Sequence, residues 1–134
     1  MTVPKVTGIG GFFFRARDPG ALNRWYGEHF GVVMVESRDY EDPGWFQDRG
    51  ETVFAGFAAD SDSFGAPEKM WKINFRVSDL DALVEQLRGA GITVETHAEA
   101  YPNGRFAELE DPERNRIQLW EPNAASIVRD PGAG

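Results

Sequence analysis

The sequence predicts an α+β fold that consists of two tandem βαβββ modules in one domain of 134 residues. The first observation is an internal repeat, since residues 13–22 and 74–83 share Phe, Arg, Asp, Ala and Leu at one constant offset. The second is the pattern within each copy, which reads as a strand, a capped helix, a glycine stop and another strand. Two copies are too few for a solenoid, so the repeat indicates a duplicated supersecondary unit.

The first module is expected over about residues 8–59. Its helix begins at the N-cap residue Asp18, has Pro19 in the first turn, where proline is tolerated, and ends at Gly31. Within this helix, apolar residues recur at helical spacing: Leu22, Trp25, Tyr26 and Phe30. Strands are expected at residues 11–16, 32–36, 44–47 and 52–58.

Residues 60–69, rich in Ser, Gly, Pro and charge, are expected to link the two modules. The second module is expected over about residues 70–122, followed by a loose tail at residues 123–134. Ser78 or Asp79 caps its helix. Its strands are expected at residues 71–77, 92–96, 105–110 and 116–120.

The composition argues against several classes of partner. Acidic residues number 22 and basic residues 14, and the net charge of −8 repels polyanions, so a nucleic-acid partner is not expected. The absence of cysteine excludes a disulfide scaffold, a thiolate nucleophile and zinc held by sulfur. The sequence contains no apolar run of membrane-spanning length and no visible secretion signal. We therefore expect a cytoplasmic protein that has no membrane partner.

Four motifs occur in order along the chain: FRARDP at residues 14–19, WKINFRVSDL at 71–80, GAGI at 89–92 and DPERNRIQL at 111–119. Together with the paired modules, they resemble the vicinal oxygen chelate superfamily, which includes glyoxalase I, extradiol dioxygenases, fosfomycin-resistance enzymes and bleomycin-binding proteins. The resemblance implies the glyoxalase/bleomycin-resistance fold, in which curved mixed sheets surround a cleft and the helices cover the other sheet face. It also implies a homodimer. It does not by itself give the reaction, because one fold supports many.

Metal-using members of this superfamily carry a His on each first strand and a Glu in each last strand. The corresponding positions here hold Gly11, Lys72, Gln118 and the apolar segment 53–57. Glycine has no side chain and lysine brings a positive charge, whereas a divalent cation needs several convergent oxygen or nitrogen donors. The resemblance therefore implies a member that has lost the metal centre and has no cofactor. The alternative is one divalent metal ion held by unconventional ligands such as Gln118 and Glu108.

Strand alternation assigns side chains to the two faces of each sheet. Apolar residues such as Ile73 and Phe75 should meet the helices, and the residues between them should face the cleft. Aromatic side chains in such a cleft bury flat ligands, and polar ones orient them. The candidate ligand-binding residues are Phe13, Arg15, Trp45, Lys72, Asn74, Arg76, Tyr101, Phe106, Glu108, Gln118 and Trp120.

Lys72 and Glu108 are also the candidate catalytic residues. A lysine flanked by arginines loses basicity, which favours Schiff-base or general-base chemistry, and Glu108 could act as a base. The alternative is that Glu108 forms a simple ion pair with Lys72 or Arg76. His97 and Glu99 lie two residues apart and form another donor pair, but an exposed, polar connection explains that sequence better, since two donors do not make a metal cage.

The leading functional hypothesis is a metal-independent protein that binds and sequesters a small, partly aromatic molecule, as bleomycin-binding proteins do. The first alternative is a metal-dependent lyase, isomerase or dioxygenase of the glyoxalase type. The second is an accessory module whose cleft is filled by a partner. In the leading hypothesis the partners are a small-molecule ligand and a second copy of the chain.

Overall fold

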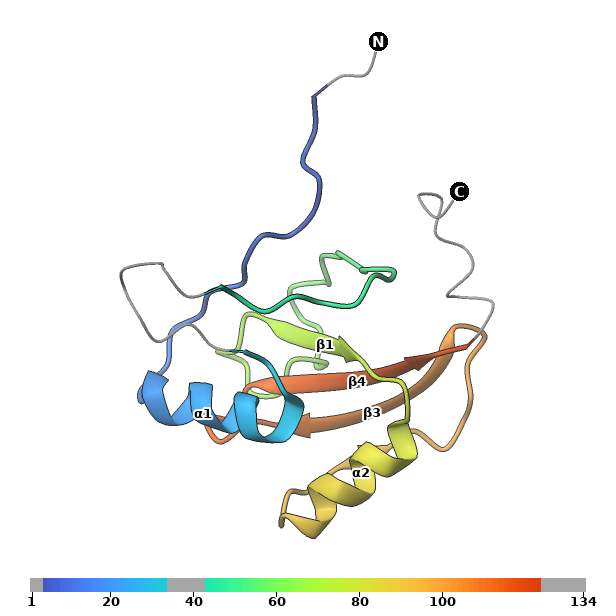
Figure 1. The fold of residues 1–134 in the computed structure, drawn as a ribbon. Coiled ribbons are helices and arrows are strands. Elements are labelled where there is room, and N and C mark those ends of the chain that lie inside the picture. The colour runs from blue at the N-terminus through green and yellow to red at the C-terminus, as the bar shows by residue number, and fades with distance from the viewer. Residues whose placement is uncertain (1–3, 34–42, 124–134) are drawn as a thin grey trace.

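The computed structural model describes residues 4–33 and 43–123. Its elements are α1 (Pro19–Phe30), β1 (Lys72–Arg76), α2 (Leu80–Gly89), β2 (Glu95–Thr96), β3 (Gly104–Glu110) and β4 (Arg116–Pro122). The strands form one sheet in the order β1-β4-β3-β2, and both helices lie on the same side of it (Figure 1). This confirms the α+β class. Within the described ranges, neither helix is long and apolar enough to cross a membrane.

The second module has the predicted βαβββ order. β1 pairs with β4 in parallel, because α2 carries the chain across to β2, and β3 pairs with β2 and β4 in antiparallel fashion. Only β2 is much shorter than the predicted strand 92–96. The Ile92 N–H donates to the Leu87 carbonyl at 3.0 Å, so Ile92 belongs to the C-terminal turn of α2. Val94 then points into the core, and two residues remain to pair with β3.

The first module differs from the prediction. Helix α1 is capped as expected, since the Asp18 side chain accepts from the Ala21 N–H and Gly31 ends the helix with a φ of +69°. However, the described residues of the first module form no strand, so the strands predicted at 11–16, 44–47 and 52–58 are wrong. The predicted strand 32–36 lies mostly outside the described residues, and its first two residues are not in a strand.

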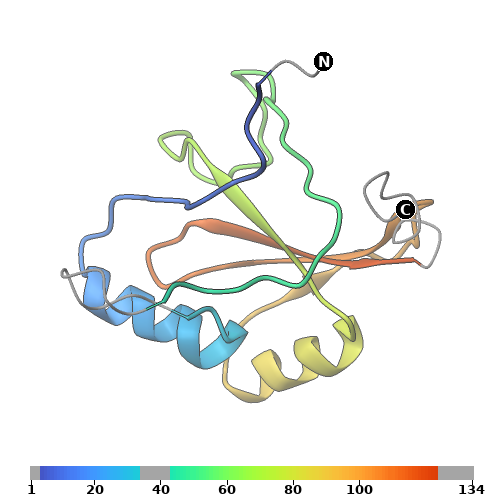
Figure 2. The ribbon, with the colours of Figure 1, turned by 45° about the horizontal axis from the view of Figure 1, so that its top comes forward.

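These segments run as extended chain beside the sheet and pair with none of its strands (Figure 2). They are rich in glycine, and Val53 and Phe54 remain 69% and 92% exposed. Little burial is therefore available to offset the entropy of ordering the backbone. Alternation of apolar residues favours an extended backbone. A β-strand also needs hydrogen bonds to a neighbouring strand, and the described residues of the first module form no such pair.

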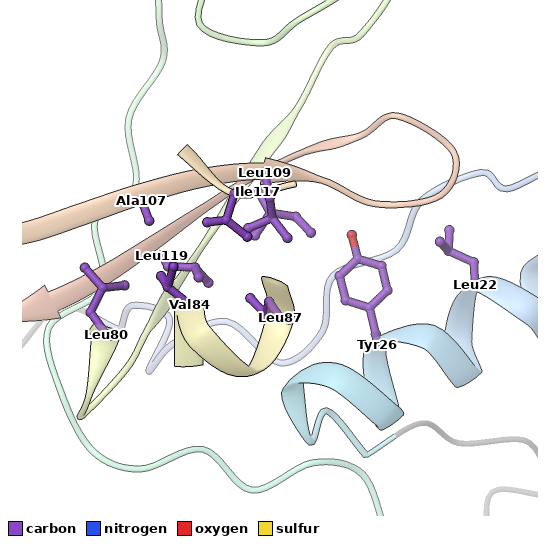
Figure 3. Close-up of a cluster of buried hydrophobic side chains, with 10 residues drawn as sticks. Leu22, Tyr26, Leu80, Val84, Leu87, Ala107, Leu109, Ile117 and Leu119 are labelled. Atoms are coloured by element: carbon purple, nitrogen blue, oxygen red, sulfur yellow. The ribbon is translucent and has the colours of Figure 1, made fainter. Parts of the chain in front are cut away.

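The hydrophobic core lies between the helices and the sheet. Leu80, Val84 and Leu87 of α2 point toward Ile117 and Leu119 of β4 (Figure 3). These five side chains are at most 4% exposed, and full burial of each stabilises the fold by about 1.5–3 kcal/mol. The apolar stripe of α2 therefore fixes which face of the sheet is covered and which is left for other contacts.

A buried carboxylate ties α1 to the turn between β3 and β4. Asp111 Oδ1 accepts from the backbone N–H groups of Glu113 and Asn115 at 2.8 and 3.0 Å. Its Oδ2 accepts from the Asn115 side-chain amide at 2.8 Å and from the Tyr26 hydroxyl at 2.6 Å. Burial, together with the hydrogen bond to Asp111, raises the pKa of Tyr26 far above its usual value. The DPERN part of the motif at 111–115 therefore has a structural role.

We expect Tyr26→Phe to lower the free energy of unfolding by about 1.5–3 kcal/mol, because it leaves a buried charged acceptor without one donor. Urea unfolding at neutral pH measures the change. Tyr101→Phe is the control, since its hydroxyl lies 3.4 Å from His97 at an exposed position, and its effect should stay within about 0.5 kcal/mol. Equal effects of the two changes would contradict the structural role of the Tyr26–Asp111 bond.

Candidate functional site

The sheet face opposite the helices, here called the outer face, carries most of the predicted site residues. Residues that lie opposite each other in neighbouring strands share a face. Asn74 lies opposite Gln118, which in turn lies opposite Glu108, and Trp120 lies between Arg76 and Phe106. The structure brings together these residues on that face: Lys72, Asn74, Arg76, Phe106, Glu108, Gln118 and Trp120.

The centre of the outer face is an ionic cluster on Glu108. Lys72 Nζ lies 2.7 Å from Glu108 Oε1, and His97 Nε2 lies 3.0 Å from Glu108 Oε2. The Lys72 and Glu108 side chains are only 13% and 18% exposed, so this pair is more strongly coupled than a surface ion pair. Beside it, Asn74 Nδ2 donates to Gln118 Oε1 at 2.7 Å. The ion pair anticipated between Glu108 and Lys72 is therefore present.

Glu108 is held in its charged form. Burial tends to raise the pKa of Glu108, but the hydrogen bonds from Lys72 and His97 outweigh it and keep this pKa below its usual value. A carboxylate with a lowered pKa is a weak proton acceptor near neutral pH. The arrangement therefore opposes a role of Glu108 as general base.

His97 belongs to this cluster, although the sequence pointed to its pairing with Glu99. The His97 N–H donates to the Phe106 carbonyl at 3.0 Å, which continues the β2–β3 ladder and turns the imidazole toward Glu108. When Nε2 carries the proton toward Glu108, Nδ1 is left to accept from the Tyr101 hydroxyl, 3.4 Å away. Knowing how residues 95–97 pair with β3 would have been enough to place His97 beside Glu108.

Aromatic side chains flank the ionic cluster. The rings of Phe106 and Trp120 stack with centroids 6.3 Å apart and planes 5° from parallel, and the Tyr101 ring meets Phe106 edge-on at 5.7 Å. Trp120 is 3% exposed and its Nε1 donates to the Asn103 carbonyl at 2.7 Å, whereas Tyr101 is 39% exposed. Trp120 therefore supports the wall from behind, and Phe106 and Tyr101 form its accessible part.

The predicted residues of the first module lie elsewhere. The Trp45 ring contacts Phe75, whose side chain lies on the helix side of the sheet. Phe13 is 92% exposed, and Arg15 borders a hollow beside the start of α1. From this part of the chain, the Asp48 carbonyl reaches the outer face, where it accepts from Arg76 at 3.1 Å.

The side chains at the superfamily's metal positions do not fit a divalent cation. Lys72 places an ammonium group 2.7 Å from the one carboxylate of the cluster, and the Gln118 oxygen already accepts from Asn74. Gly11 offers no donor. In residues 4–33 and 43–123, no group of three or more His, Cys, Asp or Glu side chains could hold a metal ion.

Comparison with known proteins identifies the family. The model of the family described as glyoxalase-like domain matches residues 11–120. The chain belongs to this glyoxalase-like family. A search of the curated proteins gave no match.

Three solved structures resemble this glyoxalase-like protein over most of its length. TnmS3, an antibiotic binding protein from Streptomyces sp. CB03234, is 20% identical with a TM-score of 0.60, covering 90% of this chain and 99% of that one. A glyoxylase/bleomycin resistance protein/dioxygenase domain from Frankia sp. EAN1pec is 18% identical with a TM-score of 0.57, covering 89% and 100%. A lactoylglutathione lyase from Agrobacterium tumefaciens is 23% identical with a TM-score of 0.53, covering 87% and 95%. At these identities the likeness shows the fold.

We expect Glu108→Gln to lower the free energy of unfolding at pH 7 by about 1–2 kcal/mol, between the values for exposed and buried ion pairs. Because the pKa of Glu108 is lower in the folded protein, its stabilising effect is present above the usual value of 4.5 and is lost as the pH falls below it. Urea unfolding of both proteins from neutral to acidic pH should therefore show the gap shrinking below that pH.

Glu110→Gln is the matched control, since Glu110 lies on the same strand but is 38% exposed, and its nearest arginine atoms are 3.8 and 3.9 Å away. Its effect on the free energy of unfolding should be small. A gap for Glu108→Gln that stays constant down to strongly acidic pH would show that the ion pair with Lys72 does not stabilise the fold.

Proposed function

We propose that this glyoxalase-like protein binds a small, partly aromatic molecule on the outer face of its sheet, without a metal ion, and releases it unchanged. The observation that carries the proposal is the Lys72–Glu108–His97 cluster. Lys72 stands at one of the positions where metal-using members of the superfamily carry a metal ligand. The charges of the cluster are satisfied within the protein, so the face offers a recognition surface rather than a reactive centre.

The chemistry of the outer face suits an aromatic ligand with polar substituents. Phe106 and Tyr101 present ring surface, and a stacked or edge-on ring pair contributes about 0.5–1.5 kcal/mol beyond the area that it buries. The Asn74 and Gln118 amides keep further donors and acceptors for the ligand after bonding each other. TnmS3, which shares the fold, is described as an antibiotic binding protein, so antibiotics belong in the first ligand panel.

Two features of the cluster support binding rather than catalysis. Schiff-base chemistry needs a free amine that can attack a carbonyl, and Lys72 Nζ is engaged with Glu108 Oε1 at 2.7 Å. General-base chemistry needs a carboxylate that takes up a proton near neutral pH, and the lowered pKa of Glu108 opposes this.

We further propose that the protein is a homodimer. Large apolar side chains of the extended first-module segments stand exposed, with Phe13 and Phe54 at 92% and Phe46 at 86%. Exposed apolar surface of this kind marks an interaction site. We favour a second copy of the chain as the partner that covers this surface. The repeated sequence pattern forms paired strands in the second module, so a second copy carries strands with which the extended first-module segments could pair.

A panel of aromatic metabolites, glycopeptide drugs and other antibiotics should contain compounds that raise the melting temperature by at least about 3 °C at saturation. Phe106→Ala should weaken binding of such a compound about tenfold, because it removes the accessible ring. Val84→Ala is the control, since it weakens the core under the other sheet face and should leave affinity unchanged. No shift with any compound, or near-stoichiometric metal that survives dialysis, would contradict the proposed function.

Light scattering during size-exclusion chromatography should give twice the chain mass of 15.0 kDa. Phe54→Glu places a charge on the exposed apolar segment and should shift the protein toward the monomer. Val33→Glu, at a 54% exposed position just after α1, is the control and should leave the mass unchanged. A monomeric parent protein would refute the homodimer and leave the ligand proposal to its own test.

A further inference from the structure

Two adjoining hollows lie away from the outer face, between the start of α1, the linker and the turn that joins β3 to β4. Each has a volume of about 530 Å³, and both are bordered by Arg17 and Glu113. The first hollow is mixed in character and is bordered by several charged side chains, whereas the second is largely apolar. Because they share two border residues, the two hollows lie next to each other.

The first hollow is basic in a protein that is acidic overall. Four cationic side chains border it, against the two carboxylates of Glu68 and Glu113. The cations are Arg15, Arg17, Lys69 and Arg114. The formal charge of this border is thus positive, although the chain carries −8. A local excess of cations on an acidic surface attracts small anions.

Two arginines of this border, Arg17 and Arg114, form only long ion pairs with neighbouring carboxylates. Arg17 Nε lies 4.0 Å from Glu113 Oε1 with its side chain 85% exposed, and Arg114 Nε lies 3.9 Å from Glu110 with 81% exposed. Exposed pairs at such distances contribute little, so both guanidinium groups can turn toward a ligand. Lys69 is fixed instead, since its Nζ donates to the Glu113 carbonyl and the Asn115 side chain at 2.9 and 3.0 Å.

Glu113 itself is engaged with the backbone. Its carboxylate accepts from the Asp18 and Arg17 N–H groups at 3.0 and 2.7 Å, and these bonds keep its pKa below the usual value. Glu113 therefore holds the start of α1 at the rim of the first hollow. Because its carboxylate is bound to the backbone, its side chain does not close over that hollow.

The second hollow supplies the apolar half. Its border includes Ala21, Leu22 and Trp25 of α1 and Pro112 of the β3–β4 turn. Trp25 is half-buried, and its ring packs edge-on against Tyr26 and Phe30 at centroid distances of 5.1 and 5.4 Å. The indole is thus held in place by its neighbours while part of it remains accessible.

We propose that the two hollows together form a binding site for a small amphiphilic anion, an aromatic carboxylate whose ring lies against Trp25 and whose acid group meets Arg15 and Arg17. This site is separate from the outer face, and the inference does not depend on the proposed function. Arg17, which borders both hollows, joins the two halves of the site.

Calorimetric titration with 2-naphthoate, 2-naphthylmethanol and inorganic phosphate tests the two halves separately. The naphthoate should bind at least about tenfold more tightly than either the neutral ring or the free anion, and its affinity should fall between about 50 and 500 mM salt. Equal affinity for naphthoate and naphthylmethanol, or absence of naphthoate binding at millimolar concentration, would overturn the proposal.

Variants then locate the binding. Arg17→Gln should weaken naphthoate binding at least about fivefold. Arg24→Gln removes the same charge from an exposed position on α1 that borders neither hollow, and should have no such effect. Trp25→Leu should also weaken binding, and Lys72→Gln on the outer face should not. Loss of binding in Lys72→Gln with full binding in Arg17→Gln would place the naphthoate on the outer face and refute the second site.

Discussion

The arrangement of the second module depends on one buried carboxylate. Asp111 accepts four hydrogen bonds, three from the turn that it closes and one from Tyr26 of α1. The turn sets the register of β3 on β4 and therefore places Glu108 opposite Gln118. A slip of one residue would exchange the two faces of β3 and send Glu108 into the core. The ionic cluster thus relies on a side chain that takes no part in it.

The Lys72–Glu108–His97 cluster shows how a fold used for metal chemistry elsewhere in its superfamily can be stabilised with other side chains. The Lys72 side chain brings a positive charge to the place where a bound cation would bring one. Together with His97, it keeps the pKa of Glu108 below its usual value. The Glu108 carboxylate that a cation would need is engaged with Lys72 and His97. What the face retains is its shape, its aromatic flank and its amide groups, which are properties of a binding surface.

The second module could be predicted from the sequence because its signals are local. Asp79 caps α2, the apolar stripe faces the sheet, and alternation in β3 and β4 assigns the two faces correctly. The first module shows the limit, since residues 11–16 alternate as predicted, with Phe14 packed on the core and Phe13 exposed, yet no neighbouring strand pairs with them. The sequence does not reveal that His97 meets Glu108, because a register across strands is not visible in a single segment.

Gly104 begins β3 with a φ of +133°, and a β-carbon there would lie 2.9 Å from Trp120 Nε1 and still closer to the Glu121 carbonyl. A side chain at this position is disfavoured both by backbone conformation and by lack of space. Position 104 is therefore a marker for comparing sequences. A relative that carries any other residue there must have moved its equivalent of the Trp120 indole, and its aromatic wall will have a different shape even if every polar residue of the cluster is identical.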